Sequence, residues 1–288
     1  MVERKLLARH GLKWNPFSLQ LPLEALQRSA PIDSFCRRVE NLAREGGFAL
    51  LTGEPGTGKS SAMRLLAEHL AGLPDLRVGE LSRRQSHMAD FYRELGELFG
   101  VTLTPHNRWA GTKALRERWH AHISSALYRP VVLVDEAQEM LPTVLSEMRL
   151  MSSVDLDSRL LLTVVLAGDS RLRNKLRTEE LLPLASRIRV RFHLESLAPA
   201  ALAQALRQGL DNAGNPRLMT DELITTLAEH AAGNHRVLMN LGAELLVAAA
   251  ERELSQLDDK LYFELYALPK TAGSPRDART KRSPRSRR

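Results

Sequence analysis

The stretch Gly53-Glu54-Pro55-Gly56-Thr57-Gly58-Lys59-Ser60 (GEPGTGKS) decides the fold of this 288-residue chain. It follows the apolar run FALL at residues 48–51, and apolar residues at helical spacing follow it up to residue 70. The pattern G-x-x-x-x-G-K-[ST] between a strand and a helix predicts a phosphate-binding loop. In a chain of this length the pattern arises by chance with a probability of about one per cent, which disfavours an ordinary glycine turn.

Each residue type in this loop has a chemical reason. The glycines let the backbone bend so that successive N–H groups point at phosphates, and the following helix adds its positive amino-terminal end. Lys59 reaches the β- and γ-phosphates as a point charge, and the Ser60 hydroxyl ligates Mg²⁺. The predicted nucleotide-binding residues are Gly53, Glu54, Pro55, Gly56, Thr57, Gly58, Lys59, Ser60 and Ser61.

A second motif, VVLVDE at residues 131–136, complements the loop. An all-apolar run of this kind suits a central parallel strand that is buried on both faces. At the end of such a strand Asp135 can hold the Mg²⁺ shell together with Ser60. Glu136 is then placed to orient and deprotonate the attacking water. The two motifs together predict Mg²⁺-dependent hydrolysis of ATP, with ATP and Mg²⁺ as the ligands.

The pattern of apolar, polar and charged residues divides the chain into four parts. Residues 1–30 read as an irregular N-terminal arm, and residues 31–198 as an α/β core that opens with a helix after Pro31. Strands at 48–52, 131–134, 160–167 and 189–194, separated by helical segments, predict a parallel sheet with helices on both faces. Residues 199–268 contain helical patterns alone and predict a small all-helical lid domain, and residues 269–288 form a basic tail.

Charge and composition bound the possible functions. The chain has no apolar run long enough to span a membrane, no signal-peptide core at its start, and one cysteine, which excludes an internal disulfide. A cytoplasmic protein fits these features. Residues 270–288 hold eight basic residues and one acid, so the whole net charge of +7 lies there. This tail is expected to be disordered, and either an arm for nucleic-acid phosphates or a solvated tail accounts for it.

The motifs resemble those of AAA+ ATPases, and their order is similar to the branch that contains ExeA-type ATPases and the transposition ATPases TnsC, TniB and MuB. The resemblance covers roughly residues 10 to 265. The P-loop and Asp-Glu pair are specific to the superfamily only, whereas minor motifs narrow it to the branch. These are NPF at 15–17, GFALLTGE at 47–54, DEAQ at 135–138, LSEMRL at 145–150, LAG at 166–168, SRI at 186–188 and GNHR at 233–236. Pro16 and Phe17 line the adenine pocket or serve as an apolar staple for the arm.

The resemblance implies further roles. Asp169 stands where a polar sensor residue contacts the γ-phosphate or the water, although ExeA-like members usually have Gln there. Arg187 matches the arginine that a neighbouring subunit inserts into the ATP site, with Arg189 and Arg191 as competitors. Arg236 in the lid would reach the phosphates and couple the nucleotide state to the lid angle. If Arg187 acts in trans, the protein assembles with ATP as a ring or a helical filament.

Two basic, polar stretches are candidates for contact with DNA. They lie at residues 82–87 and 104–113, on either side of an amphipathic helix at 88–99. Family members that bind duplex DNA do so with this part of the core, and such contacts would carry no sequence information. Two solvated loops are the alternative interpretation. The candidate DNA-binding residues are Arg83, Arg84, Arg108 and Lys113.

The resemblance therefore leads to three functional hypotheses. The first is a DNA-transposition ATPase that polymerises on duplex DNA with ATP, selects a target and recruits a transposase or another recombination protein. The second is an ExeA-type secretion ATPase; those proteins carry a transmembrane helix and a wall-binding domain after the ATPase, where this sequence has a basic tail. The third is a loader that remodels a protein partner. No membrane partner is expected.

Overall fold

The structure, a computed structural model, describes residues 2–82, 87–102, 108–154 and 158–266. Its centre is a five-stranded sheet in which all neighbouring strands are parallel. In spatial order the strands are β2 (Leu76–Leu81), β3 (Arg129–Val134), β6 (Thr163–Gly168), β1 (Gly47–Gly53) and β7 (Ile188–Leu194). The predicted α/β class with a parallel sheet is confirmed.

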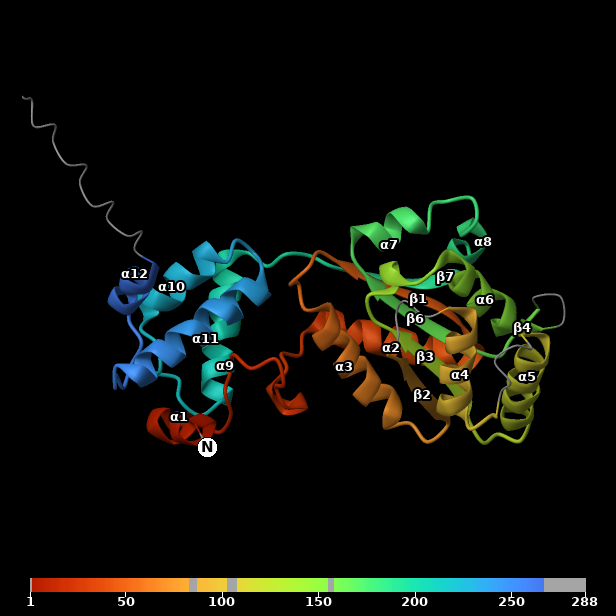
Figure 1. Cartoon of the computed structure of the whole chain (residues 1–288), viewed down its shortest axis with the longest axis horizontal. Helices are drawn as coiled ribbons and strands as arrows, with labels where there is room; N and C mark the ends of the chain where they lie inside the picture. Colours follow the sequence, from red (N-terminus) through yellow and green to blue (C-terminus); the bar gives the residue numbers. More distant parts are fainter. Residues whose placement is uncertain (1, 83–86, 103–107, 155–157, 267–288) are drawn as a thin grey trace, which may run out of the picture.

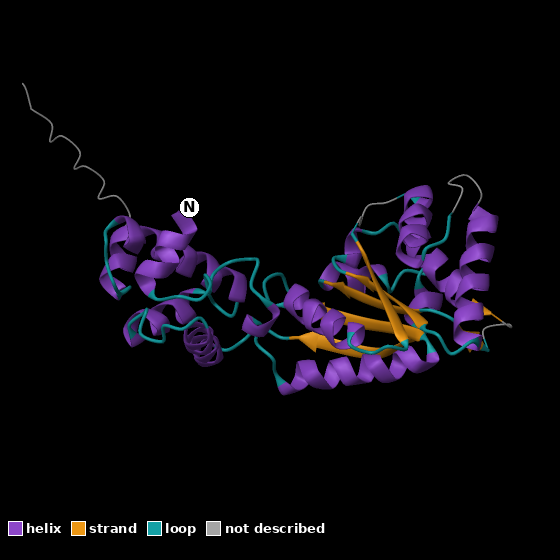
Figure 2. Cartoon of the chain, turned by 90° about the horizontal axis from the view of Figure 1, so that it is seen from below, coloured by secondary structure: helices purple, strands orange, loops and turns teal. Residues whose placement is uncertain are grey.

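Helices cover both faces of the sheet (Figure 2). One face packs against α2 (Ala30–Glu45) and α3 (Lys59–Ala71). The opposite face carries α4 (Met88–Phe99), α5 (Arg108–Ser124), α6 (Pro142–Ser152), α7 (Ser170–Lys175) and α8 (Leu182–Ala185). The central strands are buried on both sides, which explains their near-continuous apolar sequences.

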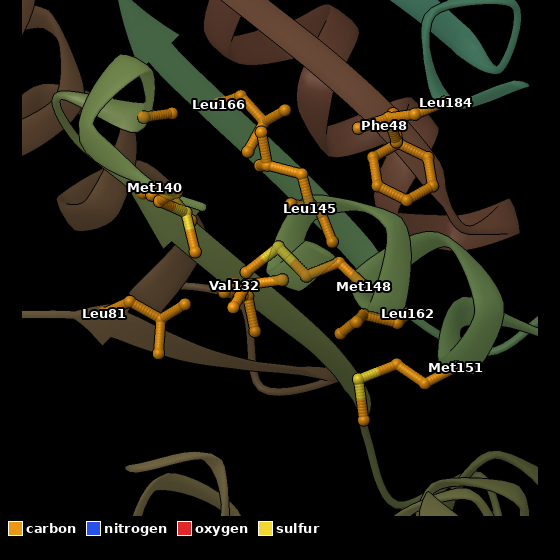
Figure 3. Packing of buried hydrophobic residues seen from close by; sticks show 14 of the residues in the cluster. Phe48, Leu81, Val132, Met140, Leu145, Met148, Met151, Leu162, Leu166 and Leu184 are labelled. Carbon is orange, nitrogen blue, oxygen red and sulfur yellow. The ribbon is translucent and has the colours of Figure 1, made fainter. Parts of the chain in front are cut away.

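Alternation along the strands assigns their side chains to two apolar clusters. In β1, Phe48 and Leu50 join the cluster under α4–α8, whereas Ala49 and Leu51 join the cluster under α2 and α3, as the two-residue period of a strand requires. Figure 3 shows side chains of α6 packed beside Val132 and Leu166 of the sheet. Full burial of such side chains stabilises the fold by about 1.5–3 kcal/mol each.

Helices alone follow the last strand, as the sequence predicts. They are α9 (Pro199–Asn212), α10 (Asp221–His230), α11 (His235–Glu251) and α12 (Asp259–Tyr266). They share an apolar cluster of their own, and in Figure 1 they lie at one end of the molecule with α5 at the other. Thr220 caps α10 by accepting a hydrogen bond from Leu223 N at 3.2 Å, as Thr does at helix starts.

The N-terminal residues, predicted to be irregular, contain helix α1 (Val2–His10) and a short 3₁₀ helix (Leu23–Ala25). The prediction was wrong for α1, which packs against the C-terminal helices. Leu6 and Leu7 pack on the apolar cluster of α9–α12, and Arg9 forms an ion pair with Glu253 at 3.2 Å.

Three further differences concern the core. Strand β2 was not predicted, because it is an edge strand in which the exposed Arg77 and Glu80 interrupt the apolar residues of the sequence LRVGEL. The predicted strand at 160–167 starts later, at residue 163, because Leu160 belongs to the short strand β5 (Arg159–Leu160), which pairs with β4 (Ser153–Val154). The predicted loop at 104–113 becomes helix from residue 108, so Lys113 lies on α5.

Candidate nucleotide site

The loop between β1 and α3 has the bent backbone that its glycines permit. Gly56 and Gly58 have φ angles of 87° and 97°, which side chains rarely allow. Gly53 is also required sterically, because a Cβ there would lie 2.8 Å from the Leu194 carbonyl oxygen. Helix α3 begins directly after Gly58, so its free N–H groups and positive end face the loop. This arrangement can bind an anion.

Lys59 is folded back over the loop. Its side chain is buried, and its Nζ donates to the carbonyl oxygens of Gly53 at 2.9 Å and Glu54 at 3.0 Å. These two hydrogen bonds hold the ammonium group at the loop. A buried charge of this kind needs its hydrogen bonds to offset the loss of hydration.

The sheet brings Ser60 and Asp135 together across 75 residues of sequence. Ser60 Oγ donates to Asp135 Oδ2 at 2.7 Å. A hydroxyl and a carboxylate oxygen beside a phosphate loop are the donors that Mg²⁺ accepts, because Mg²⁺ takes one or two protein oxygens and completes its shell with water and phosphates. The residues therefore fit the ion. Within the described ranges, no group of three or more His, Cys, Asp or Glu side chains could hold a metal by itself.

Glu136 follows Asp135 in a left-handed backbone conformation, with φ of 54°. Its Oε2 accepts a hydrogen bond from Gln138 Nε2. The same amide accepts, through Oε1, a hydrogen bond of 3.4 Å from Asp169 N at the end of β6. Gln138 thus links the carboxylate predicted to activate water with the neighbouring strand. The sequence contains Gln138 in its DEAQ motif, but nothing in the pattern reveals this link.

Asp169 serves here as the N-cap of α7. Its carboxylate accepts from Arg171 N at 2.8 Å and from Arg171 Nε at 2.9 Å. Burial opposes ionisation of this carboxyl, but the hydrogen bonds from Arg171 outweigh it, so the pKa of Asp169 lies below its usual value. Arg171 in turn contacts Glu139 at 2.9 Å. The role of Asp169 as a nucleotide sensor stays a prediction.

The helical region touches the phosphate loop through Asn234. Its Oδ1 caps α11 by accepting from Arg236 N and Val237 N, at 3.0 and 3.2 Å, while its Nδ2 donates to the Pro55 carbonyl oxygen at 3.2 Å. The contact is close, because a Cβ on Gly56 would lie 1.9 Å from Asn234 Oδ1. The contact places the start of α11, and with it the exposed Arg236, beside the loop.

We expect Asn234→Asp to keep the cap of α11 but to lose the donor to Pro55 and add a negative charge beside the phosphate loop. ATP affinity should fall about tenfold, from one lost hydrogen bond and the added repulsion. Calorimetric titration with ATP measures the change. Asn215→Asp is the matched control, because Asn215 also accepts from a backbone N–H and donates to a carbonyl, that of His10, away from the loop. Equal ATP affinities of Asn234→Asp and Asn215→Asp would contradict a role of Asn234 at the phosphate loop.

A cleft of about 320 Å³ lies beside the loop. Thr57, Gly58 and Ser61 line one side, and Pro16, Leu26, His235 and Met239 are among the residues that line the rest. Burial lowers the pKa of His235 in this cleft. Phe17 does not line it: this ring is buried against Gly242 of α11, where a Cβ would lie 2.4 Å from it. Pro16 therefore lines the cleft, whereas Phe17 packs the N-terminal segment against α11.

The three arginines that compete for the role in trans have different surroundings. Arg187 Nη1 donates to Pro183 O at 2.7 Å, and Arg191 Nη2 donates to Ala185 O at 2.8 Å. Arg189 forms an ion pair with Glu45 at 2.6 Å in the same chain. The geometry leaves Arg187 and Arg191 on the α8 side of β7, and the choice between them stays open.

The candidate DNA contacts are placed only in part. Arg83, Arg84 and the whole basic tail lie outside the described residues, and so does the side chain of Arg108. Lys113 lies on α5, where its Nζ is 3.8 Å from Glu117 Oε1 and 5.3 Å from the centroid of the exposed Trp109 ring. Their contact with DNA stays a prediction.

Comparison with known proteins agrees with the site. Residues 42–176 match the AAA domain family. The chain is 34% identical over 211 residues to the general secretion pathway protein A of Aeromonas hydrophila, an alignment that covers 72% of this chain and 38% of that protein. This chain therefore spans well under half the length of that relative. No helix in the described parts of the chain has the length and apolar character needed to cross a bilayer.

Solved structures share the fold. The Cdc6p protein of Pyrobaculum aerophilum is 14% identical with a TM-score of 0.69, over 84% of this chain and 67% of that one. The ORC1 protein of Aeropyrum pernix, solved in complex with DNA, is 20% identical with a TM-score of 0.62, over 84% of this chain and 66% of that one. At these identities the likeness concerns architecture.

Proposed function

We propose that this AAA+ ATPase binds duplex DNA without sequence preference, assembles with ATP into a ring or filament, and regulates DNA transposition. In this role it would select a target and recruit or activate a transposase. The match of the core to the AAA domain family carries the ATPase activity. The concentration of the entire net charge of +7 in the last 19 residues carries the choice of a nucleic-acid partner.

The chemistry proposed for the site uses five side chains. Lys59 and the start of α3 hold the phosphates, and Ser60 and Asp135 hold Mg²⁺. When bound, Mg²⁺ neutralises charge on the β- and γ-phosphates. Glu136 offers Oε1 to the attacking water while Gln138 holds Oε2. The carboxylate thereby orients the water and takes its proton as a general base.

Assembly follows from an arginine supplied in trans. Arg187, or Arg191, would reach the nucleotide of a neighbouring subunit and stabilise the charge that develops on the γ-phosphate. Arg236 would act within the chain, since α11 begins beside the phosphate loop. ATP would then favour both subunit contact and lid closure, and hydrolysis would reset the assembly.

Fluorescence polarisation with labelled duplex DNA tests this proposal, in ADP, in ATP and in a slowly hydrolysed analogue, together with negative-stain microscopy. The expected result is binding that depends on ATP, is indifferent to sequence, and coincides with rings or filaments. Absence of binding at low salt in every nucleotide state would overturn the DNA function and leave the ATPase in place.

A second candidate is an ATPase of secretion or envelope assembly, which the relation to a secretion pathway protein favours. A loader that remodels a protein partner is a third candidate, and the same experiment distinguishes it from the transposition proposal. Either would show ATP-dependent assembly that duplex DNA neither promotes nor requires. Measuring the ATPase rate with and without DNA separates these candidates, because the transposition proposal expects DNA to stimulate turnover.

A further inference from the structure

A cluster of basic side chains lies where β2 and β3 begin, at the end of the sheet opposite the phosphate loop. The parallel register pairs Leu76 with Arg129, the first residue of β3, and Arg77 with Pro130. The carboxyl-terminal half of α5 packs beside these strand starts and contributes Arg116 and Arg118. Figure 1 places α5 at the end of the core far from α9–α12.

One flank of the cluster is organised around His122 and Tyr128. Their rings are stacked with centroids 4.1 Å apart, and the Arg77 guanidinium lies 5.8 Å from the centroid of the Tyr128 ring. Burial lowers the pKa of His122, and the charges of Arg118 and Arg77 lower it further. Arg77 on β2 and Arg118 on α5 therefore both disfavour protonation of the half-buried His122 imidazole.

The other flank joins β3, β5 and α5. Arg159 Nη1 lies 3.1 Å from His120 Nε2, and Arg116 Nη2 donates to the Ser153 carbonyl oxygen. Burial lowers the pKa of Arg129, and the charge of Arg159 adds to this effect. The basic cluster thus comprises five arginines, namely Arg77, Arg116, Arg118, Arg129 and Arg159.

In the described ranges, none of the five arginines forms an ion pair, although arginines elsewhere do, such as Arg207 with Asp221 and Arg252 with Glu264. The dipole of α5 favours a basic residue in its last turn, which is His122 and not Arg116 or Arg118. It does not account for Arg77, Arg129 and Arg159, which come from strands.

We propose that the basic cluster binds the phosphate backbone of duplex DNA, a second contact surface besides the loops beside α4. The inference rests on the DNA partner of the proposed function. Guanidinium groups bind phosphate through two parallel hydrogen bonds and lose little hydration on doing so. A polyanion such as duplex DNA presents a regular row of phosphates, which several arginines can neutralise together. Phosphates therefore fit this cluster.

The test compares two double variants with the same change in net charge. Arg77→Glu with Arg118→Glu reverses two exposed members of the cluster, and Arg207→Glu with Arg252→Glu reverses two exposed arginines of the helical region. The cluster variant should bind labelled duplex DNA at least tenfold more weakly. Its plot of log affinity against log salt should be shallower by about 1.8, since each lost phosphate contact reduces the slope by about 0.9. The control should keep the wild-type slope.

Should the charge-reversed variant fail to fold, the measurement is repeated with Arg77→Gln and Arg118→Gln together. We expect the loss of DNA affinity to have the same direction and to be smaller. ATP hydrolysis without DNA should equal that of the wild type for every variant that folds. If the wild type binds DNA and the cluster variant has the same salt slope as the wild type, the proposed role of the cluster is wrong and the proposed function stands. A wild type that binds a polyglutamate peptide through these arginines, but no DNA, would overturn both and indicate an acidic protein partner.

Discussion

Glu136→Gln should slow ATP hydrolysis by about 10²- to 10⁴-fold while ATP still binds. The amide preserves the shape of the side chain, but it cannot take a proton from water. The expected loss appears in kcat, because the proposed role of Glu136 is to act on the attacking water, whereas the loop of Lys59 would hold the phosphates. A steady-state phosphate-release assay gives kcat, and binding of a fluorescent ATP analogue gives the affinity.

The same variant connects chemistry with assembly. If hydrolysis resets the oligomer, Glu136→Gln should accumulate rings or filaments in ATP. The control is Glu179→Gln, the same substitution at an exposed glutamate, and it should behave as wild type. Slow hydrolysis without greater assembly would separate the ATPase from oligomerisation and contradict the proposed coupling.

Lys59→Ala should weaken ATP binding by about 10- to 150-fold, since hydrogen bonds to charged groups contribute about 1.5–3 kcal/mol and each 1.4 kcal/mol is a factor of ten. The substitution removes the ammonium group that faces the phosphates. It also removes the two hydrogen bonds that tie the side chain to Gly53 and Glu54. Titration with the fluorescent analogue measures the affinity, and Lys260→Ala on the exposed surface of α12 is the control. If Lys59→Ala and the wild type bind the analogue with affinities equal within twofold, the interpretation of this segment as a phosphate loop is wrong.

Local sequence was sufficient for the elements that carry the loop. The strand before Gly53 and the helix after Gly58 follow from an apolar run and from helical spacing, and both lie where predicted. The alternation of strands and helices was likewise sufficient for the parallel sheet. Edge strand β2 was not predicted because the exposed Arg77 and Glu80 interrupt its apolar residues. Helix α1 was not predicted because its partner is 241 residues away along the chain.

The proximity of Ser60 and Asp135 could be anticipated, since the carboxyl ends of all strands of a parallel sheet lie at the same edge, although β6 lies between β1 and β3. The links made by Gln138 and Asn234 could not, because each side chain contacts a partner that the sequence does not single out. Gln138 reaches a backbone N–H on another strand. Asn234 reaches a carbonyl of the phosphate loop 179 residues earlier.

By itself, the sequence determined the chemistry of this protein: a phosphate loop, an acidic pair at a strand end and a basic C-terminal segment, all of which are local patterns. Only the tertiary structure decided which side chains tune that chemistry and where unbalanced charge gathers. The five arginines of the basic cluster lie between residues 77 and 159 and show no common spacing. They become one surface because the parallel sheet brings its strand starts to the same edge and α5 packs across them.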